Sequence, residues 1–131
     1  MIDDLTSVLQ RQLDAASALE RRLRATELLI ENGEHRFLAM AVDEVTTASD
    51  RLAALELTRT LLLRGIGAPD EVSGSELADA VDGDAALRFT DALAALRTAV
   101  ARVTVRRERV RHLLESARDE GRARLETAGV A

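Results

Sequence analysis

One stretch of this sequence, residues 84–125, has the apolar spacing of a single long helix. It contains no proline and one interior glycine, Gly121. Its apolar residues step alternately by four and three positions, a heptad spacing that is broken only where Arg107 replaces an apolar residue. These residues are Phe89, Leu93, Leu96, Val100, Val103, Val110, Leu114 and Ala117. Such a helix is roughly 63 Å long, more than a compact domain of this size needs, so we expect other helices to lie along it.

Two further long helices are predicted before this stretch. The first covers about residues 3–32 and ends at Asn32-Gly33, because both of these residues tolerate the left-handed backbone conformation in which helices often end. The second covers about residues 34–63, and it is followed by a segment with two glycines and the only proline of the chain. Apolar residues spaced by three and four positions give both helices an inner face.

A short helix is predicted over residues 75–81. The sequence Ser73-Gly-Ser-Glu76 has the spacing of a capping box, and Asp82-Gly83-Asp84 separates the short helix from the long one. Residues 126–131 lose the apolar period and are expected to fray. The elements together predict one all-α domain over residues 1–131, an elongated antiparallel helical bundle or coiled coil of three long helices plus one short helix.

The composition favours packing between helices over a ligand pocket. Hydrophobic residues make up 47% of the chain but aromatic residues only 2%, so a deep pocket lined by rings is not expected. The absence of cysteine excludes disulfides, thiolate metal sites and cysteine nucleophiles. The net charge of -5 argues against general nucleic-acid binding. The last helix is rich in arginine and the preceding ones are acidic, a distribution that predicts ion pairs between helices.

The start of the chain does not have the pattern of a targeting segment. It carries two acidic residues where a signal peptide would be basic, and no uncharged apolar run approaches the roughly 20 residues of a membrane-spanning helix. The expectation is a cytoplasmic protein without membrane insertion.

No combination of residues predicts a catalytic, metal or cofactor site. His35 and His112 are the only histidines, and neither has a partner at a recognised metal spacing. Asp79, Asp82 and Asp84 lack the alternating spacing and the later glutamate of a calcium loop, so helix capping is the favoured interpretation. We therefore expect a protein that is not an enzyme and binds no cofactor or metal.

The arginines of the last helix do not predict a nucleic-acid interface. Helical geometry places them on opposite sides, and no aromatic residues accompany them for stacking on bases. Pairing with acidic helices of the same chain is the favoured interpretation. Arg107 is the exception, because its guanidinium occupies a seam position and needs a carboxylate partner, an exposed seam or a bound protein there.

The difference in helix length predicts a partner-binding surface. The first two helices span roughly 45 Å each against roughly 63 Å for the last, so the part of the last helix around Val103 to Ala117 is expected to be uncovered. An exposed apolar helix face on an acidic protein is most simply a site for a partner helix. The candidate partner-binding residues are Val100, Val103, Arg107, Val110, Leu113, Leu114 and Ala117.

The order of elements resembles the flagellar export chaperones of the FlgN type. The resemblance is carried by Gly33-Glu34 followed by Leu38, by the leucine-rich run 52–62, by the cap Ser73-Gly-Ser-Glu-Leu77, and by Leu113-Leu114-Glu-Ser116. It covers nearly the whole chain. Members of this family often carry asparagines just before the Leu-Leu pair, where this chain has Arg107, Arg109 and Val110.

This resemblance implies a cytoplasmic chaperone of type III secretion. Such a chaperone binds the hook-associated proteins of the hook-filament junction through its carboxy-terminal helix and delivers them to the export apparatus. The contact is a reversible helix-in-groove interaction and needs no catalysis.

Two other classes of protein remain open from the sequence. A self-associating coiled-coil structural or adaptor protein would use the same seam in a symmetric dimer, because a seam does not say whose helix fills it. A helical nucleic-acid-binding protein would show tight, salt-dependent binding, which the acidic charge disfavours. A monomer and a homodimer are both compatible with the sequence.

Overall fold

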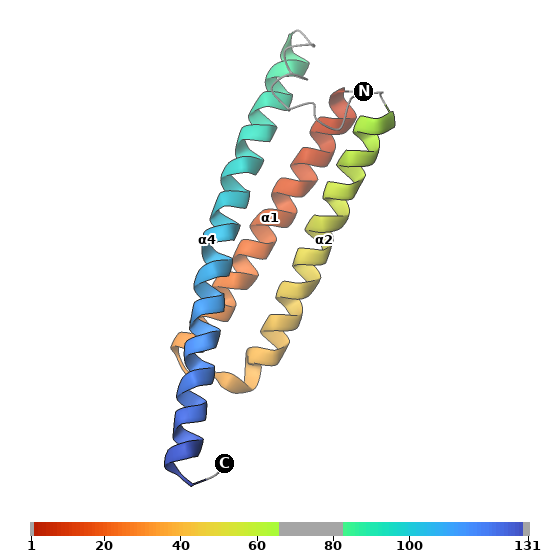
Figure 1. Ribbon diagram of the computed structural model, residues 1–131. Helices are drawn as coiled ribbons and strands as arrows, with labels where there is room; N and C mark the ends of the chain where they lie inside the picture. Colours follow the sequence, from red (N-terminus) through yellow and green to blue (C-terminus); the bar gives the residue numbers. More distant parts are fainter. Residues whose placement is uncertain (1, 66–82, 130–131) are drawn as a thin grey trace.

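Long helices form nearly all of the described structure, which covers residues 2–65 and 83–129 of a computed structural model (Figure 1). Helix α1 is Ile2–Glu31, the 3-10 helix η1 is His35–Phe37, α2 is Leu38–Gly65 and α4 is Asp84–Thr127. The described residues contain no strand, and the predicted all-α class is confirmed. The short helix predicted over residues 75–81 lies outside the described residues, as do the last two residues of the tail that was expected to fray.

Helix α1 ends at the predicted break, because the backbone there adopts the conformation of a helix C-terminus. Gly33 has a φ of +69°, in the left-handed region that favours glycine. The Glu34 amide donates to the Leu29 carbonyl at 2.9 Å and the Gly33 amide donates to the Ile30 carbonyl at 3.1 Å. These two bonds are those of a Schellman motif, which satisfies the last carbonyls of a helix.

The second long helix begins later than the sequence predicts. Instead of starting at Glu34, the chain first makes the 3-10 turn η1, and α2 starts at Leu38. The backbone amide of Phe37 donates to the carbonyl of Glu34, three residues earlier. A tight turn of this kind fits the reversal of direction between α1 and α2, because regular α-helical geometry is established only after the chain has turned.

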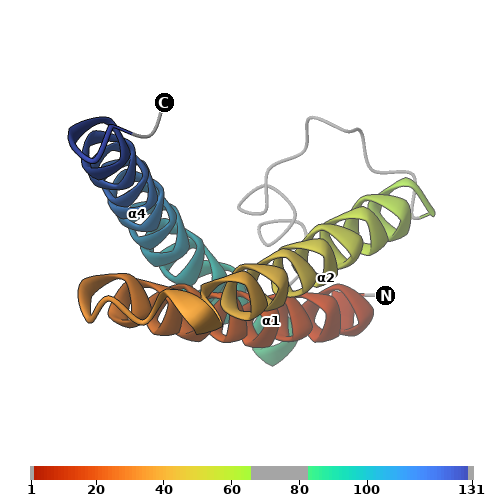
Figure 2. The same cartoon turned by 90° about the horizontal axis from the view of Figure 1, so that it is seen from below.

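Helix α1, and not the long α4, is the central element of the fold. It packs against both α2 and α4, whereas α2 and α4 make no backbone contact with each other within the described residues. Figure 1 shows α1 and α2 running in opposite directions and α4 running in the same direction as α1. Figure 2 shows α2 and α4 diverging from α1. Of the helices expected to lie along residues 84–125, only α1 does so within the described residues, and the contact between α1 and α4 is parallel.

The distribution of buried residues follows from this central position. Because α1 is covered from two sides, it needs a broad apolar arc, and most of the core leucines lie on it. Helix α2 is covered from one side and has only two buried residues, Ala41 and Leu52. The core cluster contains Leu5, Leu9, Ala15, Ala16, Leu19, Leu23, Leu52, Phe89, Ala92, Leu96, Ala99, Val103 and Val110.

Candidate partner-binding surface

Two of the predicted partner-binding residues belong to the core. Val103 is 3% exposed and Val110 is 5% exposed, and both lie in the cluster that joins α4 to α1. The expectation that the seam is uncovered around these residues is therefore wrong. The cause is that the two helices start side by side, with Arg88 Nη2 3.4 Å from Asp3 Oδ1, and α1 reaches along α4 as far as Arg109. These two valines hold α4 in place and are not available to a partner in the folded chain.

The other predicted residues lie nearer to solvent. Val100 and Arg107 are exposed, while Leu113, Leu114 and Ala117 are half-buried, and Leu114 packs against the core cluster. Because Arg107 is exposed, its guanidinium keeps its hydration at the seam position and needs no buried carboxylate. The structure thus divides the predicted set into two buried anchors and five residues that solvent can reach.

Helix α4 continues well beyond the end of α1. Arg109 places the end of α1 on α4, since its Nη2 lies 3.6 Å from the carboxylate of Glu31, the last residue of α1. Val110 is still buried in the core cluster, so we call residues 111–127, which add roughly 25 Å of helix, the α4 extension. Figure 1 shows this extension projecting past the turn between α1 and α2.

The apolar seam continues along the α4 extension. Leu114, Ala117, Gly121 and Leu125 follow one another at steps of three and four residues, so they share one side of the helix. Ala117 and Gly121 are half-buried and Leu125 is 55% exposed. An added Cβ at Gly121 would meet no other atom within 4 Å. Gly121 and Leu125 were missed as site residues from the sequence, although the continued heptad step was the signal that could have found them.

Charges on the α4 extension pair with one another along the helix. Arg111 donates to the carboxylates of Glu108 and Glu115, the latter at 2.9 Å. The hydrogen bond from Arg111 lowers the pKa of Glu108 below its usual range, and the same bond raises the pKa of Arg111. These groups are exposed, and helical geometry places them on a different side of α4 from the apolar seam.

Ion pairs join α1 and α4 just before the extension begins. Arg106 Nη1 lies 2.9 Å from Glu27 Oε2, and Arg109 Nε lies 3.6 Å from Glu27 Oε1. The Glu27 side chain is only 16% exposed, so two arginines from α4 meet one largely shielded carboxylate of α1. This arrangement agrees with the charge distribution, in which the last helix is basic and the first is acidic.

We expect Glu27 and Arg106 to be energetically coupled. A double-mutant cycle with Glu27→Gln and Arg106→Gln should give a coupling energy of about 0.5–1 kcal/mol, because the pair is partly shielded from water. Urea unfolding followed by circular dichroism measures the four stabilities. The control is the same cycle on Arg22 and Glu44, a more exposed pair at 2.9 Å between α1 and α2. Its coupling energy should be smaller. Equal coupling in both cycles would contradict the special position of Glu27.

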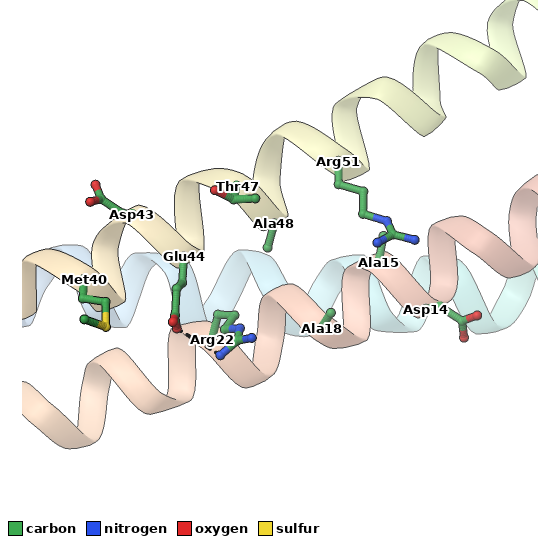
Figure 3. Close-up of a pocket in the computed structure, with 10 residues that line it drawn as sticks. All are labelled: Asp14, Ala15, Ala18, Arg22, Met40, Asp43, Glu44, Thr47, Ala48 and Arg51. Carbon is green, nitrogen blue, oxygen red and sulfur yellow. Dashed lines mark hydrogen bonds and ion pairs between the residues drawn. The ribbon is translucent and has the colours of Figure 1, made fainter. Parts of the chain in front are cut away.

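A groove of about 510 Å³ lies between α1 and α2 (Figure 3). Its floor includes the short side chains of Ala15, Ala18 and Ala48, which explains why the two helices leave a hollow there. The ion pair between Arg22 and Glu44 spans the two helices at this groove. Its charged side chains are spread along the rim and do not converge on one point, so the groove has no arrangement for acid-base chemistry.

A second groove, of about 600 Å³, lies between α1 and α4. It contains the Glu27 ion pairs described above, together with exposed Val105. Among the residues that the structure describes, no group of three or more histidine, aspartate or glutamate side chains could hold a metal ion. No helix in residues 2–65 and 83–129 combines the length and apolar character needed to cross a membrane.

Comparison with family models, curated proteins and solved structures gives no match to this chain.

Proposed function

We propose that this chain is a flagellar export chaperone of the FlgN type. In this proposal it is a cytoplasmic, non-enzymatic protein that binds the hook-associated subunits of the hook-filament junction before their export and passes them to the export apparatus. Its fold would be the three long helices together with the short helix predicted over residues 75–81. The proposal rests on the resemblance of the sequence and on the surface of α4.

The observation that carries the proposal is the apolar seam of the α4 extension. This seam continues past Glu31, where α1 ends, and α2 makes no backbone contact with α4 in the described residues. A helix face of this kind gains stability when another helix buries it, because apolar area leaves water. A helical segment of a hook-associated subunit would supply that helix and would be kept from self-association while bound.

The contact surface proposed for the partner is a revised form of the predicted set. Leu113 and Ala117 remain in it, and Gly121 and Leu125 extend it towards the end of α4. Leu114 packs against the core cluster and lies at the edge of this surface. Val100 and Arg107 lie further back on the exposed part of the same helix and would contact a longer partner segment. Val103 and Val110 act indirectly, because their burial against α1 fixes the direction in which the extension projects.

The test is complex formation with a hook-associated subunit from the same genome, measured by size-exclusion chromatography with light scattering. The native chain is expected to form a stoichiometric complex. The double substitution Ala117→Glu and Leu125→Glu should abolish this complex while leaving helicity unchanged, because it places two carboxylates on the seam without touching the core. Val110 is unsuitable for this test, since its substitution would disturb folding.

Leu87→Glu is the matched control. Leu87 is as exposed as Leu125 and lies on the same helix, but it is far from the extension. This variant should bind the subunit like the native chain. Unimpaired binding by the double variant would show that the extension is not the site.

The alternative function is a self-associating structural or adaptor protein without a role in export. The exposed leucines Leu57 and Leu61 on α2 favour self-association. The same chromatography distinguishes the two functions, because a dimer that does not respond to any hook-associated subunit would support the alternative.

A further inference from the structure

Helix α2 has an apolar surface on the side away from its packing contacts. Its inner side contacts α1, whereas Leu57 and Leu61 on its outer side are 59% and 56% exposed. These leucines are one helical turn apart and therefore lie on the same face. Between residues 52 and 63 only Glu56 and Arg59 are charged. A helix that is apolar on both sides is usually covered on both sides, so the outer face of α2 has the character of an interface.

The outer face of α2 carries a stripe of five exposed residues with a symmetric order. The stripe, which we call the α2 stripe, consists of Asp50, Ala53, Leu57, Leu61 and Arg64. At 3.6 residues per turn all five lie within an arc of about 80°. The order is symmetric about Leu57. The small Ala53 and the large Leu61 lie four positions before and after it, and the acidic Asp50 and the basic Arg64 lie seven positions before and after it.

We propose that the α2 stripe pairs with the same stripe of a second copy of this chain, with the two helices antiparallel and a two-fold axis at Leu57. Leu57 then meets its own counterpart, Ala53 faces Leu61 of the second copy, and Asp50 faces Arg64 of the second copy. Large side chains meet small ones and acids meet bases. Such a two-fold contact is closed, so it gives a dimer and not a filament.

The charges select the antiparallel direction. In a parallel pair each residue of the stripe would face its own counterpart, so Asp50 would meet Asp50, the large Leu61 would meet Leu61 and the small Ala53 would meet Ala53. Like charges that face each other across an interface destabilise it, while opposite charges favour it. The proposal is independent of the function proposed above, since the stripe lies on α2 and the extension lies on α4.

Single cysteines test the geometry directly, because the native chain contains no cysteine. Leu57→Cys should give a disulfide-linked dimer under mild oxidation, since the two sulfurs lie on the two-fold axis. Ala53→Cys alone should not, because two copies of residue 53 would be about 12 Å apart along the helices, beyond the reach of a disulfide. An equal mixture of Ala53→Cys and Leu61→Cys should give the mixed dimer. The readout is the mass of the products without reductant.

The control for the cysteine test is Leu87→Cys, an equally exposed position on α4, which should remain unlinked. Cross-linking of Ala53→Cys to itself would show a parallel contact and overturn the proposal. Cross-linking of Leu57→Cys no faster than of Leu87→Cys would overturn it as well.

Sedimentation of variants without cysteine tests the energetics. The native chain should show a concentration-dependent dimer, Leu57→Arg should be monomeric with unchanged helicity, and Leu87→Arg should dimerise like the native chain. Asp50→Arg should weaken dimerisation about fivefold. A native chain that stays monomeric at every concentration, or a Leu57→Arg variant that dimerises normally, would overturn the proposal.

Discussion

Replacing Leu19 by alanine is expected to lower the free energy of unfolding by about 3–4 kcal/mol. Leu19 is 0% exposed and lies near the middle of α1, in the core cluster to which all three long helices contribute. The substitution removes apolar contacts and leaves a cavity that α2 and α4 cannot both close, because each is also held by its own contacts along α1. The loss is a large share of the roughly 5–15 kcal/mol that stabilises a typical domain.

Urea unfolding followed by circular dichroism measures this effect. Leu87→Ala is the matched control, because it makes the same chemical change at a position that is 63% exposed. Its free energy of unfolding should change by no more than about 0.5 kcal/mol. Similar losses in the two variants would mean that Leu19 does not lie in a shared core and that α1 is not the central helix.

Replacing Gln12 by methionine is expected to raise the free energy of unfolding by about 1–2 kcal/mol. Gln12 is 1% exposed, and none of the residues that the structure describes donates a hydrogen bond to its buried side-chain Oε1. A buried carbonyl oxygen that gives up its hydration and gains no bond costs stability. Methionine has a similar length and shape, so it fills the same space without that cost.

The same urea experiment distinguishes this effect from a general benefit of methionine. Gln10→Met changes an exposed glutamine two residues away and should alter stability by no more than about 0.5 kcal/mol. The free energy of unfolding of Gln12→Ala should be lower than that of Gln12→Met, because alanine removes the amide but also leaves a void. A loss of stability in Gln12→Met would show that the amide is hydrogen-bonded in the folded protein.

Most of the local structure could be predicted from the sequence. The break at Asn32-Gly33 could be predicted because glycine adopts a positive φ at no steric cost. The structure places Gly33 in that conformation. The end of α2 and the start of α4 lie close to the predicted positions, beside the glycines and the proline of the intervening segment. Such signals depend on a few neighbouring residues, and tertiary contacts need not be known to interpret them.

The candidate site was only partly predictable, because exposure depends on what other helices cover. The heptad step correctly placed Val103, Val110 and Leu114 on one side of α4, but it could not show that α1 buries the two valines. The same spacing could have placed Gly121 and Leu125 on this seam, but it could not show that they lie beyond the end of α1. The apolar period shows that one face of a helix is apolar. It does not show how far a neighbouring helix extends along that face.

The sequence by itself determined that the chain is helical, which face of each long helix is apolar, and, apart from the start of α2, roughly where the long helices begin and end. Only the tertiary structure decided that α1 is the central helix, that α4 runs parallel to it, and that α2 and α4 make no backbone contact in the described residues. The physical reason is that helix formation and its termination are local, with bonds and turns between near neighbours. The choice of which apolar faces meet depends on residues far apart in the chain, such as Glu27 and Arg106, whose pairing no local pattern specifies.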